Sequence, residues 1–187
     1  MKVLIKAAFL AAACGLAAIS APAQEPAADN DIANRIISVP VPARYRVDGL
    51  RNGGRVHSDA SVQGGKALRV DVPGRSEQVW SVAVSVPITQ AVHANDQLIL
   101  AFWARLEQGE NGATSAELPY NAVQLASAPY TQVFGGPATI GPEWHMFEIH
   151  GRATQDYAAG ALNVAMHLAT GHQTVDIGPV FVLNMGQ

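Results

Sequence analysis

The sequence predicts an all-β protein, a jelly-roll β-sandwich, and two observations support that prediction. From residue 36 onward, β-type apolar runs alternate with turn-forming residues, and no helical stripe extends beyond about two turns. Short strands separated by turns at this spacing are typical of sandwiches and jelly rolls. The expected strands are residues 36–41, 55–58, 67–72, 79–87, 97–106, 119–127, 131–134, 144–151, 161–169 and 173–183.

Turn-forming residues justify the end of each expected strand. Gly permits backbone conformations that other residues avoid, Pro fixes φ, and Asn and Asp bond to their own backbone. In chain order, the breaking segments are Asn52-Gly53-Gly54, Gly64-Gly65, Pro73-Gly74, Asn95-Asp96, 109–112, Gly135-Gly136-Pro137, Gly141-Pro142 and Gly171.

The N-terminus predicts a secretory signal peptide over residues 1–23. Lys2 and Lys6 precede an apolar stretch, and Ala21-Pro22-Ala23 has the small-x-small pattern of a cleavage site. The stretch is too short for a membrane span, so we expect a secreted or periplasmic protein. Cys14 is the single cysteine, and reading it as a lipobox residue would require an unusually short leader. Residues 24–35 are expected to form a flexible tether, and residues 36–187 a single domain.

The charge balance disfavours several partners. The whole chain has 12 basic and 15 acidic residues and a formal net charge of −3. Loss of the leader would also remove Lys2 and Lys6. An acidic domain argues against nucleic acid and anionic membranes as partners.

Alternation along the strands separates core faces from outer faces. In residues 97–106 the better core set begins with Leu98, which leaves Trp103 and Arg105 on the other face. In the same way, residues 161–169 place an apolar set on one face of the strand and Asn163 and His167 on the other. Residues 119–127 place Tyr120, Ala122 and Gln124 outward, and residues 79–87 place Ser81, Ala83 and Ser85 outward with Trp80 inward beside Val82, Val84 and Val86.

The order of these segments resembles a known group of proteins. The order is GG-x-ALRV, a strand ending at Pro87, a polar turn with Asp96, then LILAFWAR, EWHMFEI, ALNVAMHLA and QTVDIGPVFV, and the resemblance covers roughly residues 58–184. This order is similar to the non-catalytic carbohydrate-binding modules of families four, nine, sixteen and twenty-two, which are galactose-binding-like jelly rolls. The resemblance implies a stand-alone module that binds a polysaccharide or oligosaccharide beside a separately encoded carbohydrate-active enzyme. Where the family usually closes with two acids that help hold calcium, this chain has Gly178-Pro179.

If the central strands share one sheet, their outward residues form a sugar-binding groove over a floor of Ala and Ser. Sugar rings stack on aromatic planes, and mixed donors and acceptors bind hydroxyl groups. The candidate binding residues are Trp103, Arg105, Tyr120, Gln124, Asn163 and His167.

Two alternatives to this groove stay open at the level of sequence. Trp103 and Arg105 could instead pack under a loop, with the polar residues merely facing water. Tyr130, Phe134 and Tyr157 lie in or beside loops, where an end-on site could form. Trp80 and Trp144 are interpreted as structural.

The sequence lacks the usual motifs of enzymes. There is no Gly-x-Ser-x-Gly elbow, and His145 and His150 lie five positions apart, an odd offset, as do His167 and His172. Neither pair can share a metal from one strand face. A polysaccharide lyase could use Arg105, His167, Gln124 and Tyr120, but its family sequence words are missing.

We therefore expect no catalytic residue and no cofactor. A structural calcium could take oxygen ligands from four acids, although isolated acids at strand ends are usually turn formers. These acids are Asp48, Asp71, Asp96 and Asp176. A different class, a jelly-roll accessory or assembly protein, would present an apolar surface patch to another protein.

Overall fold

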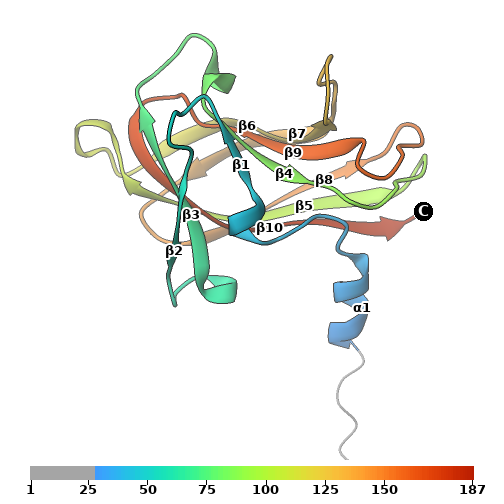
Figure 1. Cartoon of the computed structure of the whole chain (residues 1–187). Helices are drawn as coiled ribbons and strands as arrows, with labels where there is room; N and C mark the ends of the chain where they lie inside the picture. The colour runs from blue at the N-terminus through green and yellow to red at the C-terminus, as the bar shows by residue number, and fades with distance from the viewer. Residues whose placement is uncertain (1–27) are drawn as a thin grey trace, which may run out of the picture.

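The computed structural model describes residues 28–187, and it consists of two stacked antiparallel β-sheets (Figure 1). The expected signal peptide, and residues 24–27 of the expected tether, lie outside these described residues. The strands are β1 (Arg46–Asp48), β2 (Arg55–Ser58), β3 (Lys66–Pro73), β4 (Ala83–Pro87), β5 (Gln97–Gln108), β6 (Ala116–Leu125), β7 (Gln132–Ile140), β8 (His145–Arg152), β9 (Leu162–His167) and β10 (His172–Gly186).

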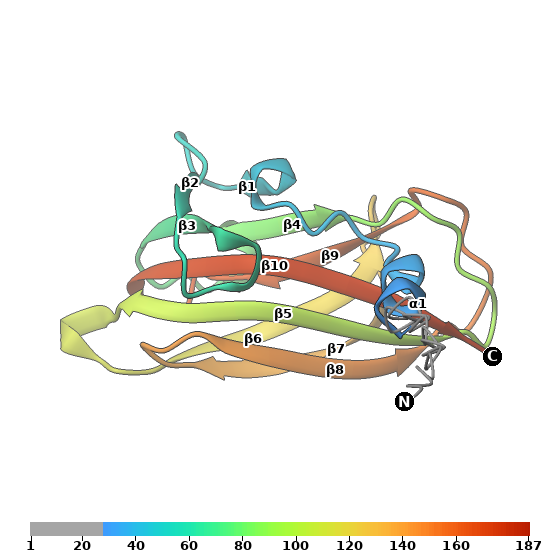
Figure 2. The ribbon, with the colours of Figure 1, turned by 90° about the horizontal axis from the view of Figure 1, so that it is seen from below.

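Each sheet has five strands joined by antiparallel pairing. One sheet has the order β1-β4-β9-β6-β7, and we call it the upper sheet because it lies uppermost in Figure 1. The other has the order β2-β3-β10-β5-β8, and we call it the lower sheet; Figure 2 shows β3, β10, β5 and β8 side by side. The predicted all-β jelly-roll sandwich is therefore confirmed.

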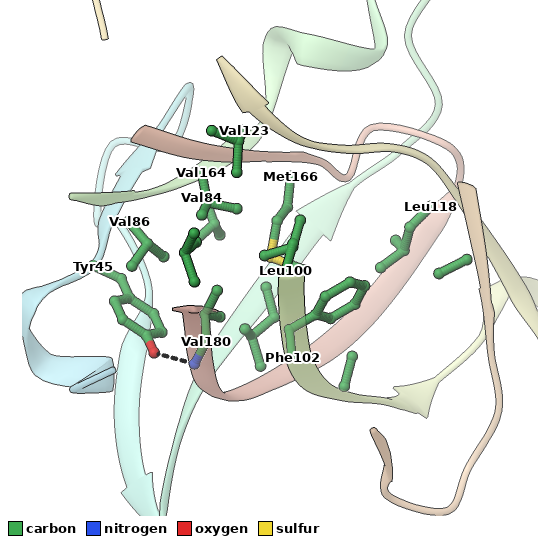
Figure 3. Close-up of a cluster of buried hydrophobic side chains, with 14 of the residues drawn as sticks. Tyr45, Val84, Val86, Leu100, Phe102, Leu118, Val123, Val164, Met166 and Val180 are labelled. Atoms are coloured by element: carbon green, nitrogen blue, oxygen red, sulfur yellow. Dashed lines mark hydrogen bonds between the residues drawn. The ribbon is translucent and has the colours of Figure 1, made fainter. Parts of the chain in front are cut away.

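The core lies between the two sheets and follows from the alternation of side chains. The inward residues of β5 are all buried, as the sequence predicts, and they meet the inward residues of β4, β6 and β9 (Figure 3). Burial of such side chains contributes about 1.5–3 kcal/mol each. The inward side chains of these four strands include Leu98, Leu100, Phe102, Ala104, Leu106, Val84, Val86, Val123, Val164 and Met166.

A buried tyrosine holds the bulge that interrupts the pairing of β10 with β5. Pairing shifts between Ile177 and Val180, across Gly178-Pro179. The Tyr45 hydroxyl accepts a hydrogen bond from the Val180 N–H at 2.8 Å and donates one to the Gly178 carbonyl at 3.3 Å (Figure 3). A Cβ at Gly178 would lie 2.9 Å from the Trp103 Cβ, so this position requires glycine. The segment that departs from the family pattern thus forms a bulge packed against Trp103.

Short helices account for two differences from the predicted elements. The structure has a helix α1 (Ala28–Arg35) inside the segment expected to be a tether, and the Arg35 guanidinium donates to the Met185 carbonyl at 3.3 Å. Residues 79–87 were expected to be one strand, but a 3₁₀ turn, η3 (Val79–Ser81), precedes β4. Three further 3₁₀ turns are η1 (Pro42–Arg44), η2 (Gln63–Gly65) and η4 (Glu110–Gly112).

Two differences concern the strands before β2. Residues 36–41 form only isolated bridges, Ile36 with Leu183 and Ser38 with Ile88, rather than a strand. The three residues of β1 pair with β4, and the sequence did not predict them because so short a run has too few residues to show alternation. No helix in the described part of the chain has the length and apolar character needed to cross a bilayer.

Candidate functional site

The structure divides the six predicted binding residues between the two sheets. Tyr120 and Gln124 lie on β6, and Asn163 and His167 lie on β9, which are neighbours in the upper sheet. Trp103 and Arg105 lie on β5, in the lower sheet. The expectation that all six share one face is therefore wrong, because strand alternation assigns a face within a strand but not the sheet to which the strand belongs.

The four residues of the upper sheet line a groove on its outer face. This groove has a volume of about 540 Å³, and side chains from β1, β4, β6, β9 and two connections surround it. In Figure 1 the connection between β3 and β4, in green, and the connection between β6 and β7, in ochre, both rise above this sheet. The lining residues are Arg46, Asp48, Trp80, Ala83, Ser85, Tyr120, Gln124, Tyr130, Asn163, Ala165 and His167.

Small residues form the floor of the groove, as the sequence predicts. Ser85 pairs directly with Ala165, and Ala165 pairs on its other side with Ala122. A Cβ at Gly135, the next partner of Ala122, would approach the Ala122 Cβ to 2.5 Å. The middle of the sheet therefore carries no long side chain, which leaves space between the larger residues at its margins.

Two exposed aromatic side chains flank this floor. Trp80 and Tyr130 are each 56% exposed, although large aromatic residues are usually mostly buried. The interpretation of Trp80 as an inward core residue is wrong: Val82, Val84 and Val86 are buried, but η3 breaks the alternation before Trp80. Tyr130 follows β6 at a positive φ of 56° in the loop before β7. Of the other two aromatic loop candidates, Phe134 and Tyr157 are buried.

Tyr120, His167 and Gln124 form a connected group at the centre. The Tyr120 and His167 rings stack with centroids 4.2 Å apart and planes 12° apart, and the Trp80 ring lies 6.4 Å from that of His167. The Tyr120 hydroxyl donates to Gln124 Oε1 at 2.8 Å. Burial raises the pKa of the Tyr120 hydroxyl and lowers the pKa of the His167 imidazole. Near neutral pH the group is therefore uncharged, with polar atoms held in fixed directions.

Asn163 connects this groove to a second cavity of about 510 Å³. Arg46, Ser85 and Asn163 line both cavities, so the two form one continuous depression along the sheet. The Asn163 side chain is only 9% exposed, and its Oδ1 has no hydrogen-bond partner within the described residues. A buried polar atom without a partner is costly, and this oxygen has almost no accessible surface of its own.

The two misplaced residues belong to a different group on the lower sheet, which we call the Asp176 cluster: Asp176, Arg69, Arg105, Glu107, Asp59 and His57. Asp176 Oδ2 accepts from Arg105 Nε at 3.0 Å and from Arg69 Nη2 at 2.8 Å. Arg105 Nη2 also lies 2.9 Å from Glu107 Oε2 and 3.1 Å from Asp59 Oδ2. His57 Nε2 lies 3.3 Å from Asp176 Oδ1 without hydrogen-bond geometry.

Two tryptophans on this side of the sandwich use their indole N–H groups in hydrogen bonds within the protein. Trp144 donates from Nε1 to Asp59 Oδ2 at 3.1 Å, and its ring lies 4.9 Å from the Arg105 guanidinium carbon. Trp103 donates from Nε1 to Gln63 Oε1 at 3.1 Å. Burial alone would raise the pKa of Asp176, but hydrogen bonds from Arg69 and Arg105 hold this pKa below its usual range. These contacts match the alternative in which Trp103 and Arg105 pack under a loop.

The four acids considered for calcium each have protein partners. Asp176 pairs with the two arginines, and Asp48 accepts from Arg46 Nε at 3.1 Å. Asp71 accepts from the Thr174 hydroxyl at 2.9 Å, and Asp96 accepts from Asn184 Nδ2 at 2.7 Å. Among residues 28–187, no group of three or more His, Cys, Asp or Glu side chains is arranged to hold a metal ion.

Sequence reasoning missed Trp80, Arg46 and Asp48 as residues of the groove. Arg46 and Asp48 lie on the short β1, whose pairing with β4 is not visible in a three-residue run. Trp80 follows a turn-forming segment that begins at Pro73-Gly74, and that proximity to a connection is the signal that could have revealed an interrupted strand.

Comparison with known proteins identifies the class of fold. No family model and no curated protein matches the sequence. A solved carbohydrate-binding module described as CBM4 is similar with a TM-score of 0.56 and 14% identity, over 76% of this chain and 96% of that one. The N-terminal cellulose-binding domain of the β-1,4-glucanase C of Cellulomonas fimi has a TM-score of 0.52 and 15% identity, over 79% and 92%.

A family 22 module points to the same class. The C-terminal carbohydrate-binding module of Clostridium thermocellum Xyn10B is similar with a TM-score of 0.50 and 16% identity, over 78% of this chain and 88% of that one. The chain therefore has the jelly-roll fold of carbohydrate-binding modules, as its sequence resemblance predicted, and this fold accounts for most of its length.

Proposed function

We propose that this protein is a non-catalytic module that binds a polysaccharide or oligosaccharide in the groove of the upper sheet. The observation that supports this most directly is the pair of exposed rings, Trp80 and Tyr130, beside a floor of small residues. Exposed aromatic planes offer stacking surfaces for the C–H faces of sugar rings. The binding residues are then Trp80, Tyr130, Tyr120, Gln124, Asn163, His167 and Arg46.

The polar groups in the groove suit hydroxyl recognition. Gln124 and Asn163 are 7% and 9% exposed, so surrounding atoms fix their amides. Fixed donors and acceptors distinguish hydroxyl directions at little entropic cost on binding. The continuous depression extends beyond one sugar unit, because the second cavity adds about 510 Å³ to the first. We therefore propose a chain of several sugar units as the ligand.

Binding without cleavage agrees with the ionisable groups of the groove. Glycoside hydrolysis usually needs two facing carboxyl groups, and Asp48 supplies the one carboxylate among the described residues that line the groove. Tyr120 would have to lose its proton to act as the base of a lyase, yet burial raises its pKa and its hydroxyl donates to Gln124. Arg105, the fourth residue of the lyase hypothesis, belongs to the Asp176 cluster.

The export of this module is a separate proposal that rests on residues 1–23. We propose that this leader is removed after Ala23, that the protein is secreted or periplasmic, and that a separately encoded carbohydrate-active enzyme works on the same polymer. Mass spectrometry of the exported protein tests the first part, and we expect an N-terminus at Gln24. An intact Met1 terminus on the exported protein would contradict the proposed cleavage.

Affinity electrophoresis tests the binding proposal. The purified protein is run through gels that contain xylan, β-glucan, mannan, pectin or alginate, and we expect retardation by at least one polymer. The same mixtures are assayed for new reducing ends and for absorbance of unsaturated products, and we expect neither. Failure of a folded protein to be retarded by any polymer would favour the protein-binding alternative, and release of products would favour an enzyme.

A further inference from the structure

The charges along the groove are not evenly distributed. Arg44 and Arg46 both line the second cavity, and the remaining residues that line it are uncharged. In the first cavity the charged residues are Arg46 and Asp48, and the lowered pKa of His167 keeps its ring neutral near pH 7. The combined depression therefore carries net positive charge, although the chain as a whole has a formal net charge of −3.

The ion pair within β1 does not remove this positive charge. Arg46 reaches Asp48 Oδ2 through Nε and Nη2, both at 3.1 Å, and the Ser85 hydroxyl lies 3.5 Å from the same oxygen. Asp48 thus offsets one arginine and orients its guanidinium. Arg44 is exposed and has no ion-pair partner within the described residues. One positive charge is left uncompensated at this end of the depression.

The end of the depression opposite Arg44 leads to a region of net negative charge. A third cavity, of about 540 Å³, lies beyond Val79 and Pro119, the chain neighbours of Trp80 and Tyr120. Its charged residues are Arg75, Glu110 and Glu117, which give net negative charge. A ligand with an anionic group would therefore be favoured at the Arg44 end and disfavoured at the Glu117 end.

We propose that the groove selects an acidic glycan, with an oxyanion of the sugar chain bound by Arg44 and Arg46 beside Asn163. This inference deepens the proposed function and rests on it. A planar guanidinium binds a carboxylate or a sulfate through parallel N–H groups, and such charge-assisted bonds are stronger than neutral ones. Uncharged rings then stack on Trp80 and Tyr130, so the anionic unit has a fixed position relative to the stacked ones.

The experiment compares polymers that differ only in charge. Binding of the purified protein to polygalacturonate and alginate is measured beside their carboxyl-reduced counterparts, and to dextran sulfate beside dextran. We expect the charged member of a pair to bind at least roughly tenfold more tightly, with affinity falling as salt is raised. Preference for the uronates identifies a carboxylate ligand, and preference for dextran sulfate identifies a sulfate ester.

Matched variants assign the charge effect to the groove. Arg44→Gln is expected to weaken binding of the charged polymer roughly fivefold or more and to leave binding of its neutral counterpart unchanged. Arg46 is itself a residue of the groove, so Arg46→Gln is expected to weaken binding of both polymers, and of the charged polymer by at least roughly fivefold more than of the neutral one. Arg55→Gln is the control, because it removes one exposed positive charge from β2 on the lower sheet. Equal loss in all three variants would mean that only the total charge matters, and would overturn the proposal.

The possible failures are distinguishable. Equal binding of charged and neutral polymers, lost in Trp80→Ala, would overturn the acidic-glycan inference while the sugar-binding function stands. Absence of binding to every polymer, including the neutral panel, would overturn the proposed function itself.

Discussion

Replacing Trp80 with alanine is the sharpest test of the groove. The side chain is 56% exposed, and a large aromatic residue can bury about 150–250 Å². A stacked sugar would thus cover about 100 Å² of it, which at about 25 cal/mol per Å² corresponds to about 2.5 kcal/mol. Because part of that gain offsets the ordering of the ligand, we expect affinity to fall by roughly 10- to 60-fold.

Trp103→Ala is the matched control, because it makes the same substitution on the lower sheet. Binding of the best polymer from the gel panel is measured by titration calorimetry for both variants, with melting temperatures alongside. Trp80→Ala is expected to lose affinity and keep most of its stability, since more than half of this side chain is exposed. Trp103→Ala is expected to lose stability, since the partly buried Trp103 ring donates to Gln63 Oε1, and to bind normally once folded. The opposite pattern would refute the assignment of the binding face.

Three other predictions test the groove and the scaffold. Ser85→Leu, which places a larger side chain on the floor shared by both cavities, should weaken polymer binding at least roughly tenfold while changing the melting temperature little; unchanged affinity would exclude the floor as a contact surface. Asp176→Asn should lower the unfolding free energy by about 3–5 kcal/mol, because Arg69 and Arg105 lose a buried counter-charge; a calorimetric loss below about 1 kcal/mol would contradict this. The lowered pKa of His167 means that the unfolded chain binds a proton more readily, so this residue's contribution to stability is complete above about pH 6.5 and declines as pH falls toward the folded pKa. Melting curves between about pH 7.5 and 5.5 should therefore fall more steeply for the wild type than for His167→Gln, and parallel curves would contradict the assignment.

Local alternation made much of the fold predictable. The inward and outward residues of β9 follow from the sequence because side chains of one strand alternate between two faces. The sheet to which β5 belongs depends on pairing with β10 and β8, which are distant in sequence, so Trp103 could not be assigned to a face of the molecule. Trp80 was misassigned for a different reason, because a single 3₁₀ turn changes the phase of alternation. Four of the six candidate residues came together because β6 and β9 are neighbours.

The two outer faces of the sandwich carry similar residue types, and hydrogen bonding separates their roles. On the lower sheet, Trp103 and Trp144 donate their indole N–H groups within the protein, and Arg105 lies against three carboxylates. Groups satisfied in this way have little to offer a ligand, since binding would first have to break their contacts.

On the upper sheet, by contrast, the exposed tryptophan is not engaged in this way. Asn163 Oδ1 has no partner, and the Trp80 indole N–H makes no hydrogen bond within residues 28–187. Natural structures keep few buried polar atoms unpaired, because each costs about 1–3 kcal/mol. The lower sheet retains such an atom as well, His57 Nε2, so an unpaired polar atom does not by itself distinguish the two faces. The exposed rings do: Trp80 and Tyr130 are each 56% exposed, whereas Trp103 and Trp144 donate their indole N–H groups within the protein, and this difference is the reason to propose the binding site on the upper sheet.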